Sequence, residues 1–357
     1  MTRGILRRRP IQLLLLAALV FVIASAVPPA IINTMRPLKP GQSFTYATEP
    51  SETVSLVTSH AGDTIPEPNR DLPECTEPIT LETPSRCLSA IIPSQQVTAV
   101  TTSETDEKDT VSVESVMQVW MMDTVMAEIR NTAIVDAHTV LPIPTPSAQM
   151  AVSVPDLSSG MATDPFVREG MHLFFPFPTQ RVSYPWFDIS LVDTVLLDYV
   201  GEEEVDGIDA YVFHYRLDGE ALDRDSPNAI SLDPEFDGPL DLLESSGFGA
   251  LHYAVDRTLW VEPETGTILN QRELNHIYFA NDDAESTARA FHGDPDYSVF
   301  FSDAPWDADT RAQQHTTASE QLSTMRWLQV FSVGLKSLSL ILVLVAVALL
   351  IRERRKA

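Results

Sequence analysis

Basic residues are scarce through most of this 357-residue chain, and their scarcity excludes one class of partner. The chain has 24 Lys and Arg against 50 Asp and Glu, and ten of the basic residues lie in the terminal tails and the C-terminal apolar run. Residues 33–325 therefore carry 14 basic and 49 acidic side chains, a formal charge of −35, and their lysines are Lys39 and Lys108. A region so acidic repels nucleic acid and the surface of an anionic membrane. We expect no nucleic-acid partner.

Cysteine is also scarce, with Cys75 and Cys87 as the two residues of this type. They stand 12 residues apart in a proline-rich stretch. In an oxidising compartment the simplest expectation is one local disulfide that closes a loop. A two-cysteine metal site would need further ligands, and the nearest histidine, His60, has no zinc-type spacing. We predict a disulfide and no metal site.

Signatures of catalysis and of cofactor binding are missing. The chain has no Gly-x-Ser-x-Gly elbow, no Gly-x-x-x-x-Gly-Lys loop, no His-Glu-x-x-His pair and no dinucleotide fingerprint. We expect no enzyme activity and no cofactor. The acidic stretch 218–237 is the best candidate for calcium, but a loop starting at Asp223 has Asn228 where glycine is required. The same loop has Pro234 where glutamate is required, so we interpret the stretch as a solvated loop.

A long apolar run near the C-terminus is long enough to cross a membrane. As a helix, residues 327–351 span roughly 37 Å, against a hydrocarbon core of about 30 Å. The basic cluster 352–356 follows directly, a pattern typical of the cytoplasmic side. We predict a transmembrane helix over 326–351 and a cytoplasmic tail over 352–357.

The N-terminal run has the reverse order, with four arginines preceding apolar residues 11–27. We predict a cytoplasmic basic tail over 1–10 and a second transmembrane helix over 11–32. A cleaved signal peptide is the alternative, because Ala24-Ser25-Ala26 is an acceptable small-x-small cleavage site. Either processing exports residues 33–325. The expected protein lies in the cell membrane, with both termini cytoplasmic and the acidic main domain outside.

Alternating apolar and polar residues indicate that this main domain is mainly β. The pattern predicts strands over residues 43–47, 53–58, 96–102, 110–122, 124–129, 190–199, 209–216, 251–261 and 267–279. Antiparallel hairpins should give a twisted sheet or a barrel-like β-rich α+β domain, flanked by the two transmembrane helices. A turn is expected at Asp136-Ala137-His138 and a helix from Thr310 onward. Six prolines in 65–93 argue against a regular helix or central strand there, and Glu202-Glu203-Glu204 is expected to be a solvated turn.

Aromatic residues are densest between residues 171 and 188. Two interpretations stay open for five of them: a packed core, or the lining of an apolar ligand channel. The candidate lining residues are Phe174, Phe175, Phe177, Trp186 and Phe187.

Several segments combine aromatic residues, proline and glycine in a specific way: Phe175-Pro176-Phe177, Tyr184-Pro185-Trp186-Phe187-Asp188, Tyr199-Val200-Gly201-Glu202-Glu203 with Asp206-Gly207, Tyr211-Val212-Phe213 and Glu262-Pro263-Glu264-Thr265-Gly266. In these segments and in its two terminal spans, the chain resembles the actinobacterial family labelled porin PorA. The close resemblance covers about residues 170–270. The chain departs from the family in residues 137–151, which contain no cysteine where the family commonly has adjacent ones. The resemblance implies an actinobacterial envelope protein, and the label suggests a channel.

Three hypotheses about function follow. β-Barrel pores cross a membrane with strands, so a chain held by one or two apolar helices does not line a wide pore alone. The first hypothesis is that the exported domain binds or conveys an apolar envelope lipid or glycolipid, or supports a transport assembly of other envelope membrane proteins. The layout is similar to that of class B scavenger receptors, whose exported domains conduct lipids. The alternative is a subunit of an oligomeric porin-like channel, and an envelope hydrolase is third.

Overall fold

The chain is described by a computed structural model, which covers residues 8–34, 38–56, 65–80, 83–153, 161–222 and 249–356. It divides into two compact units, one formed by Met1–Arg36 with Ser319–Ala357 and the other by Pro37–Ala318. Most of the candidate calcium stretch, residues 223–237, and a short helix that the sequence predicts near residues 240–245 lie outside the described residues.

The first unit pairs two helices, α2 (Arg8–Thr34) and the part of α6 (Ala308–Lys356) that belongs to this unit. Both helices are long and apolar enough to cross a membrane. Helix α2 continues through Pro28 and Pro29, which lie in its last two turns. Small residues line the contact between the helices and are almost fully buried: Ala17, Ala24, Ser339 and Ala346.

Hydrogen bonds fix the direction of this helix pair. The Ser339 hydroxyl donates to the carbonyl oxygen of Ala17 at 2.8 Å, and the Ser332 hydroxyl donates to that of Ala24 at 2.9 Å. Numbering rises along one helix as it falls along the other, so the helices are antiparallel. The seven-residue spacing on both helices places these contacts on one face, where small side chains allow close approach.

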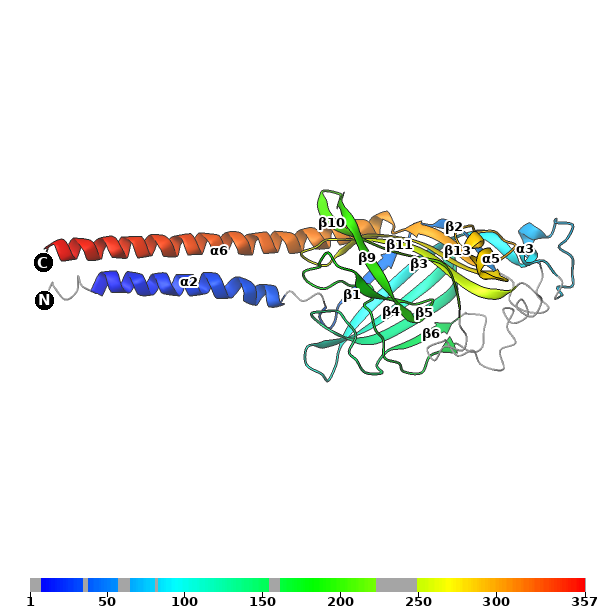
Figure 1. The fold of residues 1–357 in the computed structure, drawn as a ribbon, viewed down its shortest axis with the longest axis horizontal. Coiled ribbons are helices and arrows are strands. Elements are labelled where there is room, and N and C mark those ends of the chain that lie inside the picture. The colour runs from blue at the N-terminus through cyan, green and yellow to red at the C-terminus, as the bar shows by residue number, and fades with distance from the viewer. Residues whose placement is uncertain are drawn as a thin grey trace. The chain divides into compact units, whose positions relative to one another are not determined.

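In its described residues, the second unit contains one antiparallel sheet of thirteen strands (Figure 1). They are β1 (Ser43–Ala47), β2 (Ser51–Leu56), β3 (Ser89–Glu104), β4 (Thr110–Met121), β5 (Thr124–Asp136), β6 (Gln149–Ser153), β7 (Met161–Ala162), β8 (Tyr184–Asp188), β9 (Asp193–Val205), β10 (Ile208–Ala221), β11 (Ala250–Val261), β12 (Ile268–Ala280) and β13 (Ser298–Pro305). Their order is β7-β6-β5-β4-β3-β2-β13-β12-β11-β10-β9-β8, and β1 pairs with β3. The predicted mainly β, antiparallel fold is confirmed.

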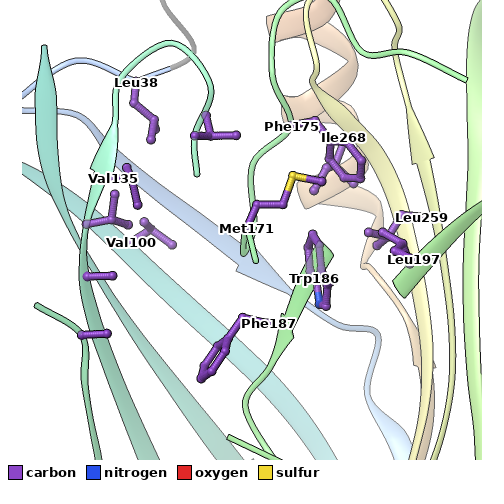
Figure 2. Close-up of a cluster of buried hydrophobic side chains, with 14 of the residues drawn as sticks. Leu38, Val100, Val135, Met171, Phe175, Trp186, Phe187, Leu197, Leu259 and Ile268 are labelled. Atoms are coloured by element: carbon purple, nitrogen blue, oxygen red, sulfur yellow. The ribbon is translucent and has the colours of Figure 1, made fainter. Parts of the chain in front are cut away.

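The sheet curls into a half-barrel. Its curl is visible in the packing, since side chains from strands far apart in the sheet share one core. Val100 on β3 and Val135 on β5 belong to the same buried cluster as Leu259 on β11. In Figure 2 these residues approach the central segment around Trp186 from its two sides. The curled sheet therefore encloses its core on its inner face.

One short segment hydrogen-bonds to strands near both ends of the sheet. Phe166 exchanges two backbone hydrogen bonds with Ala148, just before β6, at 2.9 and 3.1 Å. Met171, five residues later, donates to the carbonyl oxygen of Pro185 and accepts from the N–H of Phe187 on β8, both at 2.9 Å. The segment therefore links the β6 and β8 sides of the curled sheet.

Two expectations from the sequence were wrong. Pro93 lies inside β3, a central strand, where its partner is Glu52 on β2. The strand tolerates proline here because its pairing with β4 begins only at Ser94. On that side of Pro93 there is no partner strand to accept a hydrogen bond from the N–H that proline lacks. The run of residues 202–204 lies in β9 rather than in a turn. The turn itself is Asp206-Gly207, with φ values of 50° and 84°, as a tight two-residue hairpin requires.

The remaining elements are short. A 3-10 turn (Glu67–Asn69), helix α3 (Ser85–Leu88) and the predicted disulfide between Cys75 and Cys87 organise the proline-rich excursion before β3. Closing this loop stabilises the folded state by about 3 kcal/mol. Helix α5 (Asp283–Arg289) has an Asp282 cap that accepts from the Glu285 N–H at 2.9 Å.

Candidate functional site

The five aromatic residues proposed from the sequence lie at or beside the core. Phe175, Trp186 and Phe187 are 1%, 1% and 2% exposed and belong to one hydrophobic cluster (Figure 2). Phe174 is partly buried against this cluster, with its ring 5.6 Å from that of Phe44. Phe177 is partly exposed. At this level of burial the first three side chains each stabilise the fold by roughly 1.5–3 kcal/mol.

Two of the sequence segments that carry the family resemblance meet in space. The Thr179 N–H, just after Phe175-Pro176-Phe177, donates to the carbonyl oxygen of Pro263 at 2.8 Å. A Cβ on Gly266 would lie 2.6 Å from the carbonyl oxygen of Phe175, so only glycine fits this approach. These segments hold the aromatic core against the β11–β12 hairpin.

The inner face of the sheet changes from apolar to polar along several strands. On β4, Val111 and Val113 are buried, and the next inward residue is Ser115, also buried. On β5, Ala133 and Val135 share a face with buried Asn131. The polar residues of these and neighbouring strands line a cavity beside Trp186: Gln96, Thr98, Ser115, Asn131, His172, Arg257, Gln271, Glu273 and Asn275.

The cavity also has aromatic walls. Tyr46 and Trp306 stack with ring centroids 5.0 Å apart, and both line it together with Trp186. The centres of water-sized molecules have about 60 Å³ available, which corresponds to roughly four water positions. Mixed aromatic and polar walls are typical of sites that bind an amphiphilic or polar ligand.

A buried ion pair forms the β11–β12 wall of the cavity. Arg257 donates from Nε to Glu273 Oε2 at 2.6 Å. The side-chain amides of Gln271 and Asn275 also donate to Glu273, at 3.0 and 3.2 Å. Burial lowers the pKa of Arg257, but the negative charges of Glu273 and Asp188 outweigh it and hold that pKa well above its usual value. The pair contributes no net charge.

Behind this wall, Asp188 is fully buried and fully satisfied. The hydroxyls of Tyr215 and Tyr253 donate to its Oδ2, the second at 3.2 Å. The N–H groups of Ser190 and Leu191 donate to its Oδ1 at 2.9 and 3.2 Å. Asp188 Oδ2 also lies 3.6 Å from Arg257 Nη1, so Asp188 links the ion pair of the cavity wall to the core.

Two other ionisable side chains in or near the cavity, His172 and Arg168, have lowered pKa values, unlike Arg257. Burial, together with the positive charges of Arg168 and Arg257, lowers the pKa of His172 to about 3, so His172 is neutral at pH 7. Arg168 is 6% exposed, donates to Asn131 Oδ1 at 3.3 Å and lies over the Phe187 ring. Burial lowers its pKa to about 10. Neither residue is placed beside an activated nucleophile in the described part of the chain.

The described residues contain no cluster of three His, Cys, Asp or Glu able to hold a metal ion. Asp218, the first residue of the candidate calcium stretch, pairs with Arg216 at 2.7 Å. The arrangement in the cavity is suited to noncovalent binding by hydrogen bonds and aromatic contact.

The sequence alone did not reveal the polar cavity. Its one visible signal was the interruption of an apolar face by a polar residue, as at Ser115 within the alternating valines of β4. Arg257 and Glu273 interrupt the inner faces of β11 and β12 in the same way. Such interruptions point to an interior site once the strands are known to face each other.

Fold and helices together define a membrane protein with a curled antiparallel β domain. A sequence model of the family described as Porin PorA matches residues 10–348. The chain belongs to the porin PorA family.

Two relatives, both named Porin PorA, show the extent of the similarity. The chain is 26% identical to the protein of Corynebacterium amycolatum over 345 residues, which cover 86% of this chain and 89% of the relative. It is 26% identical to that of Corynebacterium resistens over 276 residues, 62% of this chain and 65% of the relative. The match therefore spans slightly less than two thirds of the second protein's length.

Proposed function

We propose that this chain is a two-span protein of the actinobacterial cell membrane whose exported β domain binds or conveys an envelope lipid or glycolipid. It would act alone or as support for a transport assembly of envelope membrane proteins. The observation that carries the proposal is the cavity inside the curled sheet, where Trp186, Trp306 and Tyr46 adjoin polar groups. An amphiphile needs such a mixture, because its apolar part contacts rings while its head is hydrogen-bonded.

The helix pair supports the two-span arrangement. The hydroxyls of Ser332 and Ser339 bond to carbonyl oxygens of α2, so α2 has a specific partner in α6. An antiparallel pair puts both termini on one side of a membrane, and the basic residues at both ends favour the cytoplasmic side. The outward faces of the pair remain apolar, with Leu15, Leu19, Val330 and Leu344 exposed as lipid contact requires.

Lipid retention tests the proposed function directly. Full-length protein would be purified gently from its own membranes and analysed by native mass spectrometry with lipid extraction. Recovery of a stoichiometric envelope lipid is expected for the wild type. Thr98→Phe places a ring in the cavity and should remove the lipid, whereas Ala99→Phe, on the exposed face of the same strand, should retain it. Lipid-free wild-type protein would contradict the proposal.

A channel subunit is the second candidate, favoured by the name that both relatives carry. Two helices per chain require several copies around a pore. This candidate predicts a defined oligomer in native mass spectrometry and stepwise conductance in planar bilayers. A monomer that gives no conductance would exclude it.

A further inference from the structure

Three side chains of the interior cavity carry buried polar atoms that have no hydrogen-bond partner among the described residues. These atoms are Trp186 Nε1, His172 Nδ1 and Asn275 Oδ1. Trp186 is only 1% exposed, so its N–H is out of reach of bulk water. Buried polar atoms are nearly always paired, because an unpaired one loses its hydrogen bonds to water without replacing them. Three in one cavity indicate that something else occupies it.

The chemistry of the unpaired atoms restricts the occupant. Trp186 Nε1 is a donor and needs an acceptor. Asn275 uses its amide N–H to donate to Glu273 at 3.2 Å, so its free Oδ1 is an acceptor and needs a donor. A hydroxyl both donates and accepts. A hydroxyl-bearing group therefore offers a partner to either atom, whereas a fully deprotonated anion offers no donor to Asn275.

The surrounding walls agree with an uncharged ligand of this kind. Arg257 pairs with Glu273 and lies 3.6 Å from the Asp188 carboxylate. The buried Arg168 nearby supplies a second positive charge, so these four charges balance, and His172 is neutral. The amides and hydroxyls of Gln96, Thr98, Ser115 and Gln271 also line the cavity. The space available, about 60 Å³ for water-sized centres, suits a group of roughly four to six non-hydrogen atoms.

We propose that the cavity binds a hydroxyl-rich group, one edge of a sugar ring or a polyol, which accepts from Trp186 Nε1 and donates to Asn275 Oδ1. This inference rests on the proposed ligand-binding function and names the ligand's chemistry. The group could belong to a free sugar or to the head of a glycolipid, and the test separates these sources.

The test uses full-length protein in a polyoxyethylene detergent, because alkyl maltosides carry a sugar head themselves. Thermal unfolding and native mass spectrometry would follow four probes: glucose, a glucosyl diacylglycerol, a triacylglycerol that has no free hydroxyl, and inorganic phosphate. We expect stabilisation by the glucosyl lipid but not by triacylglycerol or phosphate. Stabilisation by glucose as well would show that the head alone suffices; its absence would assign the site to a glycolipid. Both results support the proposal.

Trp186→Phe is the decisive variant. It removes an N–H that has no protein partner while keeping an aromatic ring, so the protein should still fold, with a lower melting temperature because the smaller ring packs less well. Binding of the glucosyl lipid should weaken at least tenfold. Trp260→Phe is the matched control, because its Nε1 donates to Glu203 at 2.7 Å outside the cavity, and it should bind normally. Should Trp186→Phe fold poorly, Thr98→Val removes a hydroxyl from the cavity lining and should also weaken binding.

Several results would overturn the inference. Unchanged binding by Trp186→Phe would place the ligand elsewhere. Stabilisation by phosphate alone would assign the site to an anion, with Arg168 as its partner. Binding of triacylglycerol without any sugar effect would reject the hydroxyl ligand and leave the proposed function standing. No binding of any probe, together with lipid-free protein from native membranes, would reject both the hydroxyl ligand and the proposed function. Water would then be the occupant of the cavity.

Discussion

Arg257 on β11 and Glu273 on β12 form a buried ion pair between directly paired backbone positions, with 2.6 Å between Nε and Oε2. Their side chains are 5% and 13% exposed, so removal of one partner leaves a charge without compensation. We expect Arg257→Met to lower the free energy of unfolding by about 3–5 kcal/mol. Denaturant unfolding of the full-length protein in detergent measures this loss.

A surface pair on β12 and the neighbouring β13 supplies the control. Arg272 pairs with Asp303 at 2.8 Å, and their side chains are 59% and 32% exposed. Solvent screens this pair, so Arg272→Met should cost less than about 1 kcal/mol. Equal losses for both variants would show that burial does not determine the effect.

We expect that no other residue can replace Gly170, which lies where the segment from Phe166 to Met171 meets β8. Its φ is +80°, and a Cβ would lie 2.9 Å from the backbone nitrogen of Phe187 and the carbonyl carbon of Trp186. Gly170→Ala should therefore destabilise the protein by more than the roughly 1–2 kcal/mol cost of a left-handed backbone alone. Gly41 has the same φ with no atom within 4 Å, so Gly41→Ala should pay only the backbone cost. Similar melting temperatures for the two variants would contradict the close approach.

The buried His276 should make the stability of the β domain depend on pH. Burial lowers its pKa to about 4, from an ordinary 6.5, and its ring nitrogens lie 2.9 Å from the Ala290 carbonyl oxygen and the Ser298 hydroxyl. Between these two pKa values the unfolded chain binds more protons than the folded one, so stability rises with pH. We expect a loss on the order of 3 kcal/mol as pH falls from about 6.5 to about 4.

The measurement compares thermal unfolding of the wild type and His276→Gln across this range. The variant is less stable at pH 7 but should lose less on acidification, because glutamine does not titrate. Carboxylates titrate in both proteins and cancel in the difference. Parallel pH profiles would exclude His276 as the cause.

Helix α2 should remain in the mature protein. Ala24 is fully buried and accepts a hydrogen bond from Ser332, so cleavage after Ala26 would remove the partner of α6. We expect the intact mass of protein from native membranes to equal that of protein made without signal peptidase. A mass corresponding to a chain that starts at Val27 would show that α2 is a cleaved signal peptide.

Strand positions followed closely from the sequence. The alternation in residues 110–122 predicted β4, and the Pro-Glu-Thr-Gly turn predicted the β11–β12 hairpin, both confirmed. The disulfide was also predictable, because two nearby cysteines in an oxidising compartment leave one pairing. These features are local, and backbone sterics and side-chain periodicity determine them.

Pro93 shows where local reasoning failed. Proline predicts a strand edge or a break, and the residue lies in a central strand because its partner strand on one side starts one position later. That position depends on the register of β3 with β4, which a single segment does not contain.

The sequence by itself determined the apolar helices, the acidity of the main domain, its β character and its disulfide. Only the tertiary structure decided that Phe175, Trp186 and Phe187 are core residues, and that Ser115, Asn131 and Glu273 share one cavity. The physical reason is distance along the chain. Residues on β4, β5 and β12 meet because the sheet curls. That curl depends on which strands pair, including the pairing of β2, near the start of the domain, with β13, near its end.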